Sequence, residues 1–572
     1  RRHTRYIGDW SSDVCSSDLI KNFYFEKLRM SDDFENIALG KKKLEENDID
    51  GAMHHLYKVL KDNKDHIELY LINFDLFCRN PISTKNYDFL KTIAEYYFRD
   101  NFIYHQLAFP QAIKLTNFYS NSKTESRKLS LIDLDIINEK LFQLIVKKCL
   151  ITDLNLEFYL TKIRKKLLKK FLSNTDNQFF MKIYKFLIVF AEQKFFCEFI
   201  YHVTDEEKKL LKKLENKIKK KDDICELSIL LISLYKPLNK CNYLQKKLVN
   251  YISKSNEFKE FLKYVFHDPH TDKQASISMK SMSNFSNKTS LLMKRQYEEN
   301  PFPRWRFTLR PIKGNDINEF TNRYSDTFFK KPEILIAGCG TGQQAMAWSA
   351  YKDSKIYAVD LSSESLAYAI RKAKEKNIKN INFYHLDLLD LELLNKKFDI
   401  IISTGCLHHM EKPEDGLESL VNVLKPQGLI YLGLYSKRAR SEIEWTRKYI
   451  QKRKIDVTED NMRSFRTKIL NSENKKLQSI RGLLDFFSLS NFRDLLFNYT
   501  EHTYDFIKIK ELLESKKLNF IAFNEMNPDV KNSFKNHFPN ENDEVNLELW
   551  DKFEKIYPKT FLGMYRFWVK KN

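Results

Sequence analysis

Glycine is distributed very unevenly along this 572-residue chain. Of its thirteen glycines, only Gly8, Gly40 and Gly51 occur before residue 314, whereas seven lie between Gly338 and Gly433. Glycine is the residue that adopts left-handed backbone conformations readily and lets the backbone approach a ligand closely. The distribution therefore predicts two different halves, with the unusual backbone conformations concentrated after about residue 330.

Apolar runs alternate with helical patterns in the second half. The expected strands are 333–337, 355–359, 381–385, 398–403, 428–435, 520–523 and 563–569. The expected helices between them are 343–351, 364–376 and 413–424. This alternation is typical of a doubly wound, Rossmann-like α/β sheet. A charged helical insertion is expected at 436–506, before the last two strands.

The sequence pattern predicts that the first half, residues 20–269, is helical throughout. Residues Asp33–Leu60 give two helical patterns joined around Asn47–Gly51, with small and apolar residues placed as in one degenerate tetratricopeptide hairpin. Residues 270–287 are rich in Ser, Lys and Met and poor in large apolar residues, so they are expected to be a linker. The second domain is then expected to cover residues 288–572.

Residues 1–19 differ in amino-acid composition from the rest of the chain. They lack an initiating Met and an apolar core, and they are rich in Ser and Asp. A signal peptide needs such an apolar core. We interpret this segment as a translated cloning scar and leave it out of the fold prediction.

Composition limits the classes of function. Lys and Arg number 97 against 76 Asp and Glu, which gives a net charge of +21, and Lys208–Lys221 is locally dense in lysine. We interpret that segment as a solvated helix face and expect no specific nucleic-acid binding. No apolar run approaches eighteen residues, so no membrane span is expected. The eight cysteines form no CxxC pair, which predicts a reducing, cytoplasmic location and no metal site.

A glycine loop follows the first predicted strand. Gly338, Gly340 and Gly342 lie in a strand-to-helix turn, where backbone can approach a ligand and helix amides can bind an anion. Asp360 ends the second strand, 22 residues after Gly338, where a carboxylate can accept hydrogen bonds from both hydroxyls of a ribose. Asp387, after the third strand, can reach an adenine amino group. These residues imply a cofactor that carries adenosine.

Five consecutive segments resemble the class I S-adenosylmethionine-dependent methyltransferases. They are ILIAGCGTG (334–342), IYAVDLS (356–362), FYHLDLLDL (383–391), FDIIISTGCLHHM (398–410) and LKPQGLIYLGLYS (424–436). The resemblance implies a seven-stranded sheet with an antiparallel last strand, and S-adenosylmethionine as cofactor. The residues that it implies for cofactor binding are Gly338, Gly340, Gly342, Asp360, Leu361, Asp387, Leu388, Gly405 and Cys406.

A second set of residues is expected at the substrate pocket or a lid over it. It comprises Tyr297, Arg304, Trp305, His408 and His409. Arg304 and Trp305 fit a lid or plain domain packing equally well. The two histidines have two interpretations, a general base and a role in shaping the pocket, and we favour the second. The segments 297–305 and 485–497 resemble a bacterial subgroup in which a helical, tetratricopeptide-containing region precedes the methyltransferase domain.

The sequence predicts methyl transfer by in-line displacement to an acceptor that it does not specify, with no catalytic residue assigned. The helical half is expected to bind protein or position the substrate. A catalytically silent, cofactor-binding scaffold is the alternative. A nicotinamide site is disfavoured because the third glycine of G-x-G-x-x-G is missing. Six basic residues of the insertion either attract an anionic acceptor or are simply solvated: Arg438, Arg440, Arg447, Lys448, Lys452 and Arg453.

Overall fold

The computed structural model describes residues 34–571, apart from 63–65, 102, 123–131, 174–176, 221–224, 308–313, 525 and 562. The segment 1–19, interpreted above as a cloning scar, lies outside these residues. The chain divides into two compact units. The amino-terminal unit comprises residues up to 269 together with 306–310, and the carboxyl-terminal unit comprises 270–305 together with 311–572.

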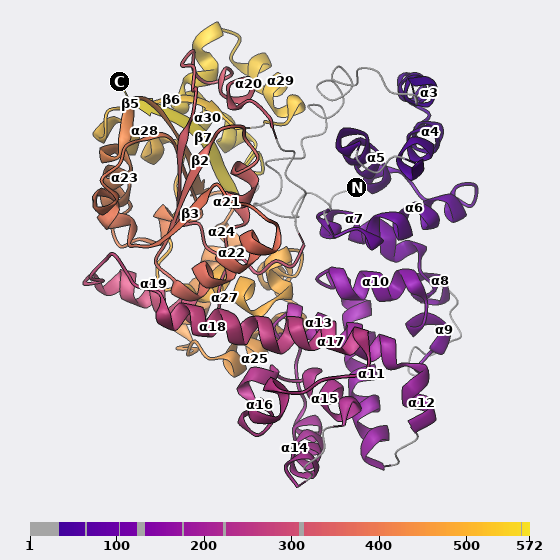
Figure 1. Ribbon diagram of the computed structural model, residues 1–572. Coiled ribbons are helices and arrows are strands. Elements are labelled where there is room, and N and C mark those ends of the chain that lie inside the picture. The colour runs from indigo at the N-terminus through magenta and orange to yellow at the C-terminus, as the bar shows by residue number, and fades with distance from the viewer. Residues whose placement is uncertain are drawn as a thin grey trace. The chain divides into compact units, whose positions relative to one another are not determined.

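The amino-terminal unit is helical, as predicted (Figure 1, indigo to magenta). Its α-helices are α3 (Phe34–Glu45), α4 (Ile49–Asp62), α5 (Ile67–Arg79), α6 (Tyr87–Arg99), α7 (His105–Ala112), α8 (Asn117–Ser122), α9 (Leu134–Ile137), α10 (Lys140–Lys148), α11 (Leu154–Ser173), α12 (Asn177–Lys182), α13 (Tyr184–Phe196), α14 (Asp205–Lys219), α15 (Glu226–Ser233), α16 (Asn242–Val249) and α17 (Asn256–Leu262).

The predicted hairpin is present as α3 and α4. A side chain at Gly40 would place its Cβ 2.9 Å from Leu56 Cδ2, so the glycine is what allows the two helices to pack closely. Asn47 turns the chain between them with a φ of 57°. The helical hairpin is therefore shown, and its membership of the tetratricopeptide class stays a prediction.

The lysine-rich segment is the solvated face of α14. Leu211 and Leu214 are buried, whereas the lysines of this helix are exposed. The helix begins with a capping box between Thr204 and Glu207, and Glu207 also pairs with the buried Arg164 at 2.9 Å. An amphipathic helix with one anchored end accounts for this run of charge.

The carboxyl-terminal unit is built on one seven-stranded sheet. Its strands are β1 (Glu333–Ala337), β2 (Lys355–Asp360), β3 (Ile381–His385), β4 (Phe398–Thr404), β5 (Leu424–Tyr435), β6 (Leu518–Phe523) and β7 (Met564–Lys571). Their order is β3-β2-β1-β4-β5-β7-β6. Only β7 runs antiparallel to its neighbours β5 and β6, as the resemblance implied.

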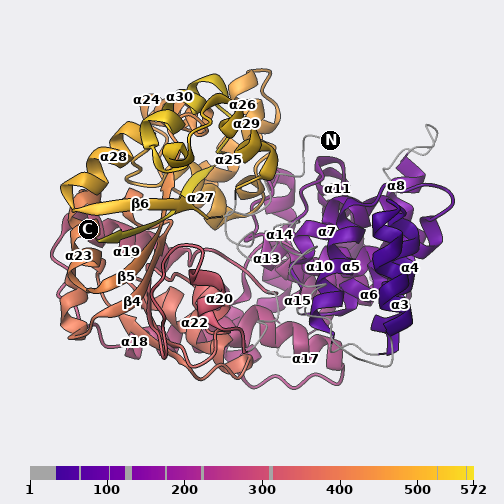
Figure 2. The same ribbon diagram turned by 90° about the horizontal axis from the view of Figure 1, so that it is seen from above.

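Alternate residues of the central strands pack on opposite faces of the sheet. Leu335 of β1 joins a core with Leu417 of α23 (Pro413–Asn422) and residues of α28 (Phe506–Ser515). Ile336 joins a second core with α20 (Ile317–Thr321), α21 (Gln343–Trp348) and α22 (Ser363–Glu375). Figure 2 shows α23 and α28 on one side of the sheet and α20 and α22 on the other. Burial on both faces explains why the strands are continuously apolar.

The expected linker at 270–287 is wrong for its first part. Residues Asp268–Ser278 form α18, and α19 follows at Lys288–Glu299. Asp272 accepts two hydrogen bonds from the guanidinium of Arg371 on α22, at 2.8 and 2.9 Å. Glu364 at the start of α22 accepts from Lys273 and Ser276 of α18, each at 2.6 Å. Polar contacts therefore hold α18 on the carboxyl-terminal unit, which explains its low content of apolar residues.

The expected insertion leaves the sheet after β5. It contains α24 (Ser441–Lys452), α25 (Glu459–Leu470), α26 (Lys475–Ile480) and α27 (Leu489–Phe497). Its ends meet at a bridge between Ser436 and Tyr504, where Lys437 N donates to Tyr504 O at 2.7 Å. A second helical excursion, α29 (Pro528–His537) and α30 (Leu547–Ile556), separates β6 from β7. No helix among the described residues has the length and apolarity needed to cross a membrane.

The pairing of α18 with α22 generates a stability prediction. Asp272→Ala should lower the free energy of unfolding of the carboxyl-terminal unit by about 1.5–3 kcal/mol, because the half-buried guanidinium of Arg371 loses a charged partner that accepts two hydrogen bonds. Hydrogen exchange of the strand amides in the full chain measures this loss. Asp268→Ala is the matched control, since Asp268 pairs with the exposed Lys263 and should change the same quantity by less than about 1 kcal/mol. Equal effects of the two substitutions would contradict the assignment of α18 to this unit.

Candidate functional site

The three glycines of the loop after β1 all have left-handed backbone. Their φ angles are 75° at Gly338, 51° at Gly340 and 82° at Gly342. A Cβ at Gly338 would lie 2.7 Å from Cys406 Sγ, and one at Gly340 would lie 2.4 Å from the carbonyl oxygen of Phe302. The loop is therefore closely covered by its own chain, and side chains are excluded by space as well as by conformation.

Asp360 ties this loop to the end of β2. Its Oδ2 accepts a hydrogen bond from Gly340 N at 2.7 Å, and its Oδ1 accepts one from Ser362 N at 2.9 Å. Burial raises the pKa of Asp360 to about 6, although the amides of Ser362 and Gly340 oppose this rise. Each carboxylate oxygen can accept a further hydrogen bond. The side chain therefore lies where the sequence predicted a ribose-binding acid.

The remaining predicted cofactor residues lie at the ends of the neighbouring strands. Asp387 is buried after β3, where its Oδ1 accepts from Leu389 N and its own amide donates to Ser283 Oγ at 2.9 Å. Leu388 is buried beside it. The carbonyl of Leu361, after β2, lies 3.1 Å from His385 Nε2. Ser283 lies in the expected linker, and no sequence pattern predicted its contact with Asp387.

Gly405 and Cys406 follow β4. Gly405 has a φ of 75°, and Cys406 Sγ lies over Gly338. Burial, followed by the charges of Asp360 and Asp387, raises the pKa of Cys406 to about 12. The thiol is therefore protonated at neutral pH, and its side chain packs against Gly338 of the glycine loop.

The segment 297–305 forms a strap over the glycine loop. Thr341 N donates to the carbonyl of Phe302 at 3.2 Å, and Thr341 Oγ1 donates to the carbonyl of Pro303 at 2.5 Å. The indole of Trp305 donates to Thr341 Oγ1 at 3.0 Å, and its ring is buried against Met346 and Ala373. Trp305 is therefore packed within this unit, and its role as part of a lid stays a prediction. Arg304, the preceding residue, is half-buried.

The side chains of Tyr297 and His409 both contact residues of the insertion. Tyr297 Oη donates to Asp494 Oδ1 of α27 at 2.8 Å, and Asn498 Nδ2 donates to the same oxygen at 3.0 Å. His409 Nδ1 lies 2.9 Å from the carbonyl of Thr500 and 3.2 Å from Asn498 Nδ2. Asp494 and Asn498 were not predicted from the sequence. They lie about ninety residues from His409 along the chain, and no local pattern connects them to it.

His408 occupies the most enclosed position of the site. It lies in η7 (Leu407–His409), is 0 % exposed, and stacks on Tyr435 at the end of β5 with ring centres 3.7 Å apart. Burial, followed by the charges of His409 and Arg440, holds the pKa of His408 well below its usual range. The imidazole is therefore neutral at physiological pH.

The basic residues of the insertion are largely paired. Arg438 binds Asp551 and Glu554 at 2.8 and 2.7 Å. Arg440 and Arg447 share Glu501, at 3.0 and 3.5 Å. Lys448, Lys452 and Arg453 are exposed, and Lys448 pairs with Glu444. The three arginines closest to the sheet are thus held by carboxylates, which weakens the expectation that they attract an anionic acceptor.

Residues 334–428 match a family of domains described as a methyltransferase domain. An uncharacterized protein of Synechococcus is 36 % identical over 115 residues, which are 20 % of this chain and 28 % of that protein. The ubiquinone biosynthesis O-methyltransferase of Rickettsia canadensis is 28 % identical over 127 residues, 22 % of this chain and 52 % of that enzyme. Among solved structures, PKMT2 of Rickettsia typhi aligns with 15 % identity and a TM-score of 0.36, over 45 % of this chain and 52 % of that one.

The chain spans between about a quarter and a half of the length of these two curated relatives. The matched residues contain the glycine loop, Asp360, Asp387 and the turn after β4, and they lie in a sheet with the strand order implied by the resemblance. The carboxyl-terminal unit therefore contains a methyltransferase domain of the S-adenosylmethionine-dependent kind.

Proposed function

We propose that this chain binds S-adenosylmethionine and transfers its methyl group to an acceptor by in-line displacement. The observation that carries the proposal is the Asp360 carboxylate, which binds Gly340 N of the glycine loop within the residues that match a methyltransferase domain. The alignment of nucleophile, methyl carbon and leaving group is the main requirement of such a reaction, because a sulfonium leaves readily.

The residues present fit this cofactor. The left-handed glycines of the loop put backbone without side chains at the turn after β1, and the buried Asp360 keeps acceptor positions for two hydroxyls. Asp387 and Leu388 would border the adenine, and Gly405 and Cys406 would border the methyl donor. When bound, the cofactor supplies an activated methyl group. The strap 297–305 and the insertion would exclude water from the reacting atoms.

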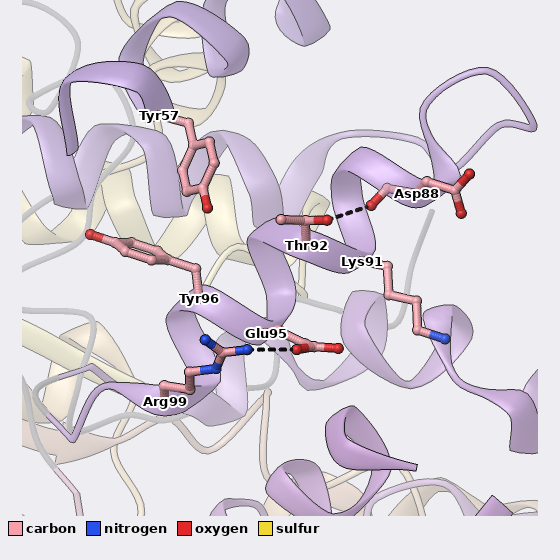
Figure 3. Close-up of a pocket in the computed structure, with 7 residues that line it drawn as sticks. All are labelled: Tyr57, Asp88, Lys91, Thr92, Glu95, Tyr96 and Arg99. Carbon is pink, nitrogen blue, oxygen red and sulfur yellow. Dashed lines mark hydrogen bonds and ion pairs between the residues drawn. The ribbon is translucent and has the colours of Figure 1, made fainter. Parts of the chain in front are cut away.

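The helical unit is proposed to bind protein or to position the acceptor. A cavity of about 320 Å³ lies on the surface of this unit, lined by Tyr57 of α4 and by one face of α6 (Figure 3). The α6 residues are Asp88, Lys91, Thr92, Glu95, Tyr96 and Arg99. The rings of Tyr57 and Tyr96 lie 5.3 Å apart, beside charges of both signs. Aromatic side chains surrounded by charged residues of both signs favour a peptide or protein ligand over nucleic acid. We further propose that the chain is located in the cytoplasm.

Calorimetry with S-adenosylhomocysteine, S-adenosylmethionine and NAD tests the cofactor assignment, and a labelled-methyl assay on fractionated bacterial lysate tests transfer. We expect the first two ligands to bind and NAD to fail. Binding without transfer to any fraction would leave the silent scaffold as the function.

If the helical unit positions the acceptor, Tyr96→Ala should lower transfer while leaving the affinity for S-adenosylhomocysteine unchanged.

Asp360 should make cofactor binding dependent on pH. Its pKa of about 6 means that the free chain holds this proton below pH 6, whereas two ribose hydroxyls need the carboxylate as acceptor. Affinity for S-adenosylhomocysteine should therefore be constant above pH 7 and fall about tenfold by pH 5, as measured by calorimetry. Asp360→Asn should bind about 1.5–3 kcal/mol more weakly and lose this dependence. The same slope in both proteins would remove Asp360 from the site.

Gly340→Ala should weaken cofactor binding strongly, because its Cβ would clash with the carbonyl of Phe302 at 2.4 Å and displace the strap. Gly314→Ala is the control. Gly314 also has a positive φ, of 94°, but no atom lies within 4 Å of its Cβ position among the residues described. Calorimetry should show a loss of tenfold or more for Gly340→Ala and no change for Gly314→Ala. Normal binding by Gly340→Ala would show that the strap tolerates movement.

A further inference from the structure

We propose that His408 is the residue that receives the proton of the methyl acceptor, and that the acceptor group is a neutral hydroxyl. This inference rests on the proposed function and specifies the part of the site that the cofactor motifs leave open. It is carried by a buried ring with poorly satisfied nitrogens, by the place of that ring in the fold, and by the pairing of the charges around it.

His408 and the glycine loop are connected through one short turn. Cys406 Sγ lies over Gly338, and His409 N donates to the carbonyl of Cys406 at 3.0 Å, which closes the turn that contains His408. Tyr435, on which His408 stacks, ends β5 next to β4. In an open α/β sheet, ligands bind outside the carboxyl ends of the strands. His408 therefore lies at the correct edge of the sheet for an acceptor placed beside the cofactor.

The ring nitrogens of His408 are poorly satisfied. Neither Nδ1 nor Nε2 makes a hydrogen bond of good geometry to the residues that the structure describes, although the ring is 0 % exposed. Among those residues, the backbone of Gly433 is the one weak partner, and it opposes the fall in the pKa of the ring. A buried polar group without a partner costs about 1–3 kcal/mol. Asn498 Oδ1, on the segment that follows α27, is likewise buried and unbonded. Both groups are satisfied if a polar ligand enters this part of the unit.

The surroundings of His408 keep its imidazole neutral and oriented. Tyr435 lies between the His408 ring and the guanidinium of Arg440, which is 3.6 Å from the centre of the Tyr435 ring. Glu501 holds Arg440 through two hydrogen bonds of 3.2 and 3.0 Å. A neutral imidazole offers one donor and one acceptor nitrogen. A hydroxyl complements both, because it donates one hydrogen bond and accepts others.

The charged groups of this cluster each have a partner of opposite charge or a hydrogen bond, which disfavours a charged acceptor, although Arg447 Nη1 and Arg493 Nε make no hydrogen bond of their own to the described residues. Glu501 binds Arg440 and Arg447, Asp494 accepts from Tyr297 and Asn498, and Arg493 binds Glu299 and Asn300. An ammonium group would enter without a free carboxylate, and a carboxylate would enter without a free cation. Burial of an unpaired charge is far more unfavourable than burial of a hydroxyl that is hydrogen-bonded.

The proposed step conserves atoms and charge. The hydroxyl oxygen forms its bond to the methyl carbon while the carbon–sulfur bond breaks and leaves its electron pair on sulfur. The hydroxyl proton passes to the lone pair of the unprotonated ring nitrogen of His408. The products are a methyl ether, a neutral thioether and an imidazolium, which later returns its proton to water. The low basicity of the buried ring favours this return.

Three probes of similar size test the class of acceptor without requiring turnover. Benzyl alcohol, benzoate and benzylamine are titrated into the full chain with bound S-adenosylhomocysteine, and the ring nitrogens are followed by NMR after ¹⁵N-histidine labelling. His408→Gln assigns the His408 signal. Benzyl alcohol should shift that signal at the lowest concentration, at least fivefold below the two charged probes. A stronger response to benzoate or benzylamine, or no response to any probe, would overturn the proposal.

The labelled-methyl assay gives a second readout. Methyl groups should enter linkages that resist mild base, as ethers do, and His408→Gln should lower transfer at least a hundredfold while retaining S-adenosylhomocysteine affinity. His537→Gln, at an exposed histidine of α29, is the matched control and should behave as the unsubstituted chain. Base-labile or amine-linked label, or full transfer by His408→Gln, would refute the role of His408. Loss of S-adenosylhomocysteine binding by the unsubstituted chain would instead refute the proposed function.

Discussion

The carboxylate of Asp360 is the interaction on which the geometry of the candidate site depends. It binds Gly340 N and Ser362 N at once, so one side chain holds the loop after β1 against the turn after β2. The left-handed glycines make that loop possible, and Thr341 then binds the strap through the Phe302 and Pro303 carbonyls. Burial raises the pKa of this carboxyl group to about 6, so at neutral pH it remains a carboxylate whose free acceptor positions are available to a ligand.

The fold of the carboxyl-terminal unit could be predicted from the sequence because its signals are local. Strands buried on both faces are short apolar runs, and the glycine loop follows the first of them. The same reasoning failed for 270–278, where Asp272 and Ser276 hold a helix through polar contacts with α22 that no apolar period reveals. It also missed α29 and α30, whose amphipathic patterns were not separated from the surrounding charged sequence.

The cofactor half of the site was predicted better than the acceptor half for a physical reason. Gly338, Asp360 and Asp387 each follow a strand, and parallel strands bring such positions to one edge. By contrast, Asp494, Asn498 and Glu501 reach His409 and Arg440 from about sixty to ninety residues away. The arginines of the insertion looked like an open basic surface in the sequence, because a charge run does not show its partners. The structure shows Arg438, Arg440 and Arg447 bound to carboxylates.

The bridge between Ser436 and Tyr504 joins the two ends of the insertion, whose helices also contact the rest of the unit, as Asp494 does through Tyr297. Four helices leave and re-enter the fold at a single point, where Tyr504 N also donates to the carbonyl of Tyr435 at 2.9 Å. Because the entry and the exit are already joined, the length of chain between them has little effect on the closure entropy. The helices between Ser436 and Tyr504 can therefore change in length and sequence, provided that contacts such as that of Arg493 with Glu299 are kept. A protein built in this way can acquire new acceptors while its sheet and its cofactor loop remain as they are.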